Sequence, residues 1–136
     1  MSATSSGDGA AVADPPTILV VEDEMLLMMT FEDMLIDFGC CVLKAGRVAK
    51  AAQLAATAAI DGAILDVNVA GETVYPVADE LRRRRIPFLF ATGYGAGGLR
   101  ADYRDWPTLG KPFRQRDLQA LVATWTVAAS AVTRRN

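Results

Sequence analysis

Acidic, hydroxyl and lysine side chains follow four short apolar runs of this sequence and could carry chemistry together. Glu22 and Asp23 follow the first run. Asp66, Thr92 and Lys111 stand at the ends of three later runs. Three carboxylates in one crevice repel one another, so they imply a hard cation with oxygen ligands. Mg²⁺ is the natural choice because it keeps waters that a phosphate can replace.

The remaining two side chains suit an anion beside that cation. A lysine can neutralise a phosphoryl oxygen, and a threonine hydroxyl can hydrogen-bond another. Each feature alone also has an ordinary explanation. Acids after a strand are often helix N-caps, Asp66 and Thr92 could be turn residues, and Lys111 could be a solvated loop charge. All four features in this order favour an aspartyl-phosphate site with a carboxylate as nucleophile.

The elements that position these side chains alternate between strands and helices. Strands are predicted from short apolar runs, and helices from apolar residues three or four positions apart. The expected strands are Thr17–Val21, Cys40–Lys44, Ile60–Val67, Pro87–Ala91 and Thr108–Gly110. The expected helices are Glu24–Phe38, Arg47–Ala59, Thr73–Arg85, a weak one near Leu99–Arg104 and Arg114–Ala128.

This alternation predicts an α/β fold. Strands separated by single helices run parallel, and right-handed crossovers place helices on both faces of the sheet. We expect a five-stranded parallel sheet of the doubly wound, flavodoxin-like (βα)5 type. Its fourth helix should be shortened, because glycines at 93, 95, 97 and 98 weaken helix formation. In such a sheet the carboxyl ends of the strands converge on the ligand-binding crevice.

Composition excludes several classes of site. The 136 residues suffice for one compact domain, and they include no histidine. A Ser-His-Asp or Cys-His centre and a His-ligated metal are therefore excluded. In a histidine-to-aspartate relay, the histidine would belong to a partner. The formal charge of −2 gives no electrostatic case for a nucleic-acid or anionic-membrane partner.

The ends of the chain differ from its middle. Residues 1–16 are small and polar and are expected to form a disordered leader, residues 17–128 the domain, and residues 129–136 a short tail. No apolar run is long enough to span a membrane, and the leader is unlike a signal peptide. Cys40 and Cys41 match no metal or redox spacing and are expected in a buried strand. A cytoplasmic location fits this cysteine usage.

Four segments together resemble a known family. ILVVEDE at the first predicted strand, then ILDVN, FATG and KPF, resemble the receiver domain of response regulators across about Thr17–Val127. The resemblance implies that Asp66 accepts a phosphoryl group. It also implies that Asp23 binds Mg²⁺ directly, Glu22 mainly through water, and Asn68 through its backbone carbonyl.

The resemblance assigns roles to the later segments as well. Thr92 would be the switch hydroxyl and Lys111 the phosphate-binding lysine, with a cis bond to Pro112. The usual switch aromatic is replaced by Thr108, and the usual proline-rich loop after the phosphoacceptor is absent. These departures resemble a single-domain subset with a Phe-Ala-Thr-Gly-Tyr signature. Tyr94 could then act in the switch, or could be an aromatic packed over a loop.

The function implied is that of a stand-alone response regulator in a two-component phosphorelay. The phosphoryl donor would be a histidine kinase or a histidine phosphotransfer protein, and the signal would pass through protein–protein contacts. The chain would be no enzyme beyond self-catalysed phosphotransfer and autodephosphorylation. Its cognate kinase, its target, its oligomeric state and its role as carrier, sink or relay stay open.

Two other functions share parts of this pattern. A haloacid-dehalogenase-like phosphatase also uses an aspartyl nucleophile with Mg²⁺, but it needs an acid two residues later, where this chain has Asn68. A phosphorylation-independent scaffold would show a lost acid or lysine, and none is lost.

Two surface features complete the sequence reading. The first helix carries Met25, Leu26, Met28 and Met29 beyond its core stripe, and Met-rich surfaces are adaptable. We name these four residues the Met surface and expect a partner there, with burial under a loop as the alternative. The run Arg82–Arg85 is expected to be a solvated helix end.

Overall fold

The computed structural model describes the backbone of residues 15–135 and the side chains up to Trp125. The strands of the main sheet are β2 (Thr17–Val21), β3 (Cys41–Ala45), β4 (Gly62–Asp66), β7 (Phe88–Thr92) and β8 (Thr108–Gly110). The helices are α1 (Met25–Asp37), α2 (Val48–Thr57), α3 (Tyr75–Arg83) and α4 (Gln115–Arg135). The shorter elements are β5 (Asn68–Val69), β6 (Glu72–Thr73), and the 3₁₀ turns η2 (Ala96–Gly98) and η3 (Ala101–Tyr103).

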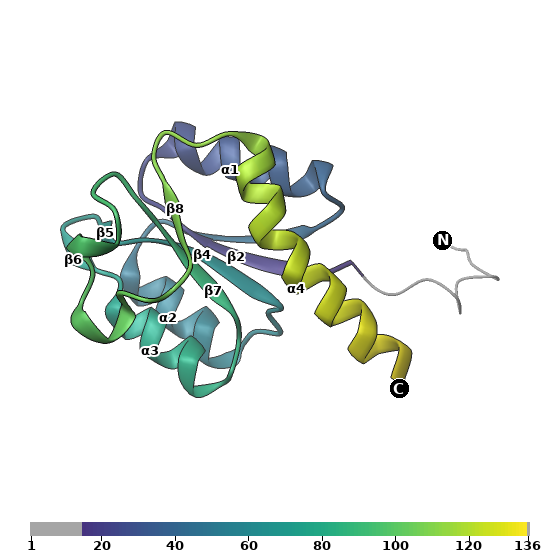
Figure 1. The fold of residues 1–136 in the computed structure, drawn as a ribbon. Coiled ribbons are helices and arrows are strands. Elements are labelled where there is room, and N and C mark those ends of the chain that lie inside the picture. Colours follow the sequence, from purple (N-terminus) through teal and green to yellow (C-terminus); the bar gives the residue numbers. More distant parts are fainter. Residues whose placement is uncertain (1–14, 136) are drawn as a thin grey trace.

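The five main strands form one parallel sheet in the order β3-β2-β4-β7-β8. After β2 the chain moves to one edge, and then crosses back past β2 toward the other edge. This is the strand order of a flavodoxin-like doubly wound sheet. Figure 1 shows α1 and α4 on one face and α2 and α3 on the other. The predicted fold class is confirmed.

Each face of the sheet has its own core layer, because successive strand residues point to opposite faces. On one face Ile18 and Val20 of β2 pack with Phe31 of α1 and Leu118 of α4. On the other face Leu19 and Val21 join the buried side chains of α2 and α3. The central strands are buried on both faces, as expected of a parallel sheet.

A glycine in β4 makes room for the last helix. A Cβ atom at Gly62 would lie 2.2 Å from Cε3 of Trp125 in α4, closer than real carbon contacts allow. Trp125 is itself buried in the layer under α1 and α4. The indole ring therefore packs directly on the backbone of β4, and only glycine leaves it that space.

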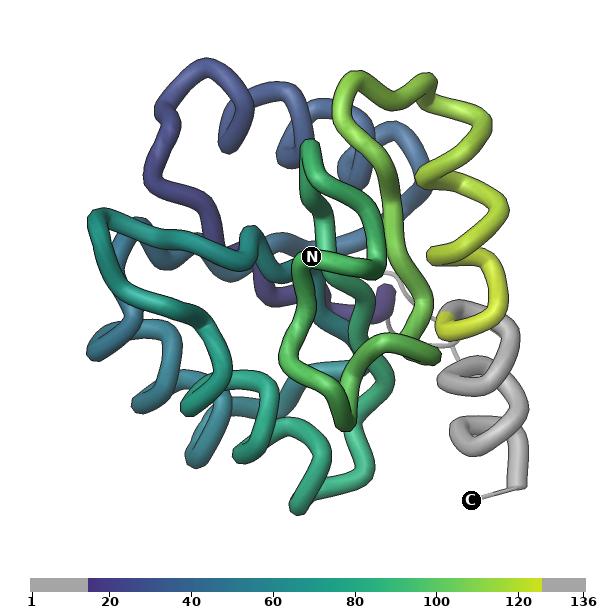
Figure 2. The backbone as a smooth tube through the Cα atoms, turned by 60° about the vertical axis from the view of Figure 1, so that its left-hand side comes forward, coloured from purple at the N-terminus to yellow at the C-terminus, as the bar shows by residue number. Residues whose placement is uncertain are grey.

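The segment between β7 and β8 differs most from the sequence prediction. The weak helix expected near Leu99–Arg104 is present only as the 3₁₀ turn η3, and η2 precedes it among the glycines. Gly95 has a φ of +72°, outside the helical region. Figure 2 shows this segment, in green, crossing the front of the molecule. The glycines thus reduce the fourth helix to two single turns.

The structure also differs from the sequence prediction at the end of α4 and at the edge strand β3. α4 extends to Arg135, seven residues past its predicted end. Cys40 is buried as expected, whereas Cys41 is exposed because β3 is an edge strand. No helix in the described part of the chain combines the length and hydropathy needed to cross a bilayer.

The arginine run at the end of α3 is more than a solvated helix end. The Arg84 guanidinium donates to the backbone oxygens of Ala55 and Ala58, at 2.6 and 2.9 Å, where α2 ends. The Arg82 guanidinium lies over the rings of Tyr103 and Trp106, 5.4 and 5.1 Å from their centroids. Both arginines therefore join elements that are distant in sequence.

Candidate functional site

The predicted site residues meet at one end of the sheet. Glu22 and Asp23 follow β2, Asp66 ends β4, Thr92 ends β7 and Lys111 follows β8. These four strands are consecutive neighbours in the sheet. Because all run parallel, their carboxyl ends share one edge, and the polar side chains gather there.

Three carboxylates form the centre of this site. One oxygen each of Glu22, Asp23 and Asp66 lies within 4.8 Å of the other two. The donor set is purely oxygen, and Asp23 is exposed while Asp66 is half-buried, so water can complete a coordination shell. This arrangement fits a hard cation that retains waters, of which Mg²⁺ is the prime example.

Glu22 is the buried member of the cluster, with 3% of its surface exposed. Burial raises the pKa of its carboxyl from 4.5 to about 7, and the negative charge of Asp66 adds to the rise. The backbone N–H of Glu24, 3.1 Å from Oε2, and the ammonium of Lys111 oppose that rise in the pKa. The cluster therefore concentrates negative charge at an energetic cost that a cation would offset.

Lys111, which follows the edge strand β8, reaches into the cluster. Its Nζ lies 3.2 Å from Oε1 of Glu22 and 3.4 Å from Oδ1 of Asp66. Its backbone N–H donates to the carbonyl of Thr92 at 3.0 Å, which ties the end of β8 to β7. The peptide bond to Pro112 is cis, as the resemblance implied. A fixed positive charge thus lies beside the Asp66 carboxylate.

Solved structures of similar fold identify the family. SdrG from Sphingomonas melonis Fr1 is 38% identical, covering 84% of this chain and 98% of that chain, with a TM-score of 0.74. A response regulator receiver protein from Sinorhizobium medicae WSM419 is 29% identical, covering 85% of this chain and 98% of that chain, with a TM-score of 0.73. This chain belongs to the response regulator receiver family.

A receiver has a role in two-component signalling, and receivers in general are signalling modules that interact with histidine kinases or phosphotransfer proteins. The receiver domain of the sensor histidine kinase PA1611 from Pseudomonas aeruginosa PAO1 is 24% identical, covering 83% of this chain and 98% of that chain, with a TM-score of 0.71. That structure has a magnesium ion coordinated in its active site cleft. No family model and no curated protein matches this chain.

The two residues considered for a switch in this receiver are placed differently. Thr92 is buried, and its hydroxyl oxygen accepts the backbone N–H of Tyr94 at 3.0 Å. The Tyr94 side chain is 87% exposed, so it is not packed over a loop in this state. Asn68, whose carbonyl was expected to bind the metal, begins β5 in an exposed position two residues past Asp66.

Sequence reasoning missed an anchor in the second half of the segment between β7 and β8. Leu99 and Tyr103 are buried, and the Tyr103 hydroxyl donates to Asp79 of α3 at 2.7 Å. Burial raises the pKa of Tyr103 to about 12, so this hydroxyl stays protonated at neutral pH. Arg100 pairs with Asp79 at 2.6 Å, and its backbone N–H donates to the Tyr75 hydroxyl. The second half of the segment is thereby held on α3.

The Met surface is exposed beside the site. Met25, Leu26 and Met29 are 75%, 73% and 51% exposed. Met28 is half-buried and packs against the core layer under α1, so it contributes less than expected. A groove of about 180 Å³ lies between α1 and the loop after β8, lined by Leu27, Thr30, Lys111, Pro112 and Phe113.

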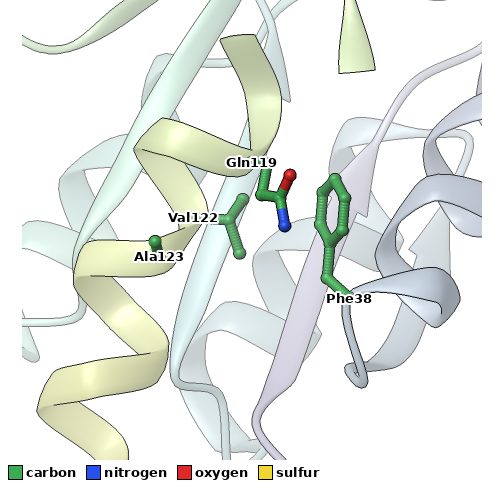
Figure 3. Close-up of a pocket in the computed structure, with 4 residues that line it drawn as sticks. All are labelled: Phe38, Gln119, Val122 and Ala123. Carbon is green, nitrogen blue, oxygen red and sulfur yellow. The ribbon is translucent and has the colours of Figure 1, made fainter. Parts of the chain in front are cut away.

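A second hollow lies at the other end of the molecule. It holds about 80 Å³ between Phe38, which follows α1, and Gln119, Val122 and Ala123 of α4 (Figure 3). None of these four side chains is titratable. α1 ends there, whereas it begins beside the acidic cluster. This hollow is therefore separate from the site.

Proposed function

We propose that this receiver accepts a phosphoryl group on Asp66 from a partner's phosphohistidine, with Mg²⁺ bound at the acidic cluster. The observation that carries the proposal is the meeting of three carboxylates with the Lys111 ammonium, 3.4 Å from Asp66. These 136 residues include no histidine, so the proposed phosphohistidine lies outside this sequence. The carboxylates suit the cation, and the lysine suits the incoming phosphoryl group.

The proposed metal ligands are carboxylate and carbonyl oxygens. Asp23, Asp66 and the carbonyl of Asn68 would hold the ion directly, and Glu22 would do so mainly through water. When bound, Mg²⁺ neutralises the carboxylates and the phosphoryl oxygens that approach them.

The remaining chemistry belongs to the side chains. An oxygen of Asp66 attacks the phosphorus, an aspartyl P–O bond forms, and the P–N bond to the partner's histidine breaks with the electron pair leaving on nitrogen. Lys111 neutralises one phosphoryl oxygen. The Thr92 hydroxyl turns toward Asp66 and donates a hydrogen bond to a second phosphoryl oxygen. A hydroxyl can donate one bond and accept another, so the bond from the N–H of Tyr94 is retained.

The Met surface is the proposed docking site for the phosphohistidine donor. It begins two residues after Asp23, so a partner bound there stands next to the phosphoacceptor. The adjoining groove shares Lys111 with the site. Adaptable methionine side chains suit such a contact, because they fit varied apolar surfaces.

Phosphorylation tests the proposal directly. Incubation with acetyl phosphate and Mg²⁺ should add one phosphoryl group, detected by intact mass spectrometry. Asp66→Asn should abolish the addition, and Asp105→Asn, an exposed acid away from the cluster, should leave it unchanged. Equal labelling of the Asp66 variant and the wild type would refute the assignment.

Metal binding tests the second half of the proposal. Asp23→Ala should weaken Mg²⁺ binding strongly in calorimetric titrations and modestly stabilise the metal-free protein, because it removes one repelling charge. Wild-type Mg²⁺ affinity in that variant would contradict the role of Asp23.

A further inference from the structure

A hairpin with a two-residue turn follows the proposed phosphoacceptor, where the usual proline-rich loop is absent. β5 and β6 pair antiparallel, with Asn68 opposite Thr73 and Val69 opposite Glu72. Ala70 and Gly71 connect them with φ values of +52° and +84°. Two consecutive residues with positive φ define a type I′ turn, the connection that best matches the twist of a hairpin.

Buried residues fix both ends of this hairpin. Val69 and Val74 are fully buried in the layer under α2 and α3. The backbone N–H of Val74 donates to the carbonyl of Val67 at 2.9 Å, which closes the base of the hairpin. Figure 1 shows β5 and β6 together at one end of the molecule. The position of the turn is thus determined by the core.

The turn contacts the metal site through its backbone. The N–H of Ala70 donates to Oδ2 of Asp23 at 3.0 Å, across 47 positions of sequence. Asp23 is exposed, and an exposed carboxylate otherwise rotates among several rotamers. A bond to one oxygen restricts that rotation and leaves the other oxygen available to a cation.

We infer that the β5–β6 hairpin is a positioning element that holds Asp23 ready for the cation, and that its turn residues set the affinity for Mg²⁺. This inference rests on the proposed function of the cluster. The affinity for Mg²⁺ falls when only part of the population holds the Asp23 carboxylate in the orientation that binds the cation. Ala70 contributes its amide, and Gly71 supplies the second left-handed residue that the turn requires.

A matched pair of glycines tests the inference. Gly71 and Gly39 have φ values of +84° and +86°, and a Cβ at either would meet no atom within 4 Å. Gly71→Ala and Gly39→Ala therefore impose the same backbone strain, one at the turn and one at the end of α1. Both variants should lose similar stability in urea titrations.

Their Mg²⁺ affinities should differ. Calorimetric titration should show weakening by up to about tenfold for Gly71→Ala, equivalent to about 1.4 kcal/mol, and wild-type affinity for Gly39→Ala. Ala70→Asn should bind at least as tightly as the wild type, because asparagine favours the left-handed conformation. Equal affinities for both glycine variants, or weakening by Ala70→Asn, would overturn the inference.

Hydrogen exchange supplies a readout without the metal. The Ala70 amide should be protected in the metal-free wild type and should lose protection in Asp23→Ala. Unchanged protection in that variant would also overturn the inference. If the wild type itself binds no Mg²⁺, the proposed function fails. If wild type and Gly71→Ala bind Mg²⁺ equally, only the role of the hairpin fails.

Discussion

Replacing Glu22 with glutamine should stabilise the metal-free protein, and the gain should depend on pH. The carboxyl ionises near 4.5 in the unfolded chain and near 7 in the folded protein, mainly because it is buried. Between these values the folded state binds more protons, so stability falls as the pH rises. Above pH 7 the whole cost of ionising the buried group is present.

The magnitude follows from the pKa difference. Each pKa unit corresponds to about 1.36 kcal/mol, so the rise from 4.5 to about 7 corresponds to about 3 kcal/mol. Glutamine keeps a neutral side chain of the same shape and avoids this cost. The stabilisation by Glu22→Gln should therefore be near zero at about pH 4.5 and reach about 3 kcal/mol at about pH 8.

Urea unfolding with a chelator, followed from acid to mildly alkaline pH, measures this difference. Glu72→Gln is the matched control, because it removes an exposed carboxyl in β6 instead of a buried one. A stabilisation by Glu22→Gln that is constant with pH, or that grows toward acid, would refute the reasoning. Saturating Mg²⁺ should shrink the difference, because the cation stabilises the ionised wild type.

Three further outcomes follow from the packing and the loops. Gly62→Ala should destabilise the protein by about 1–3 kcal/mol, because its Cβ would overlap the ring of Trp125; unchanged urea midpoints would show that the ring moves aside. Arg84→Ala should cost about 1–3 kcal/mol through two lost hydrogen bonds to α2, and more than Arg83→Ala, whose guanidinium pairs only with Glu80 among its described contacts. A phosphoryl mimic should alter hydrogen exchange within residues 93–98 and leave exchange within residues 99–103, which are held on α3, unchanged. A response confined to residues 99–103 would place the switch elsewhere.

The main sheet and the site were largely predictable from the sequence. Apolar runs such as Thr17–Val21 and Pro87–Ala91 match or overlap β2 and β7, because a buried strand leaves a continuous apolar signal. The meeting of Glu22, Asp66 and Lys111 follows from topology, since parallel strands bring their carboxyl ends to one edge. A pattern of residue types at strand ends was therefore enough to locate the cluster.

The features that were missed depend on tertiary contacts. Strands of two residues, as in β5 and β6, are too short to show periodicity, and nothing in the sequence marks Ala70 for a positive φ. The anchor of Tyr103 on Asp79 spans 24 positions, and the bonds of Arg84 to α2 span still more. Such partners are determined only once the helices have packed.

The placement of the two tryptophans gives the protein an internal fluorescent reporter in each core layer. Trp125 is buried under α1 and α4, whereas Trp106 packs against the layer of α2 and α3, within 5.3 Å of the Phe88 ring. Variants that keep one indole would therefore follow the two layers separately. Coincident unfolding transitions would show that the layers melt as one cooperative unit across the sheet. Trp106 lies between η3 and β8. Its emission alone would therefore report conformational changes between β7 and β8 without a contribution from the opposite face.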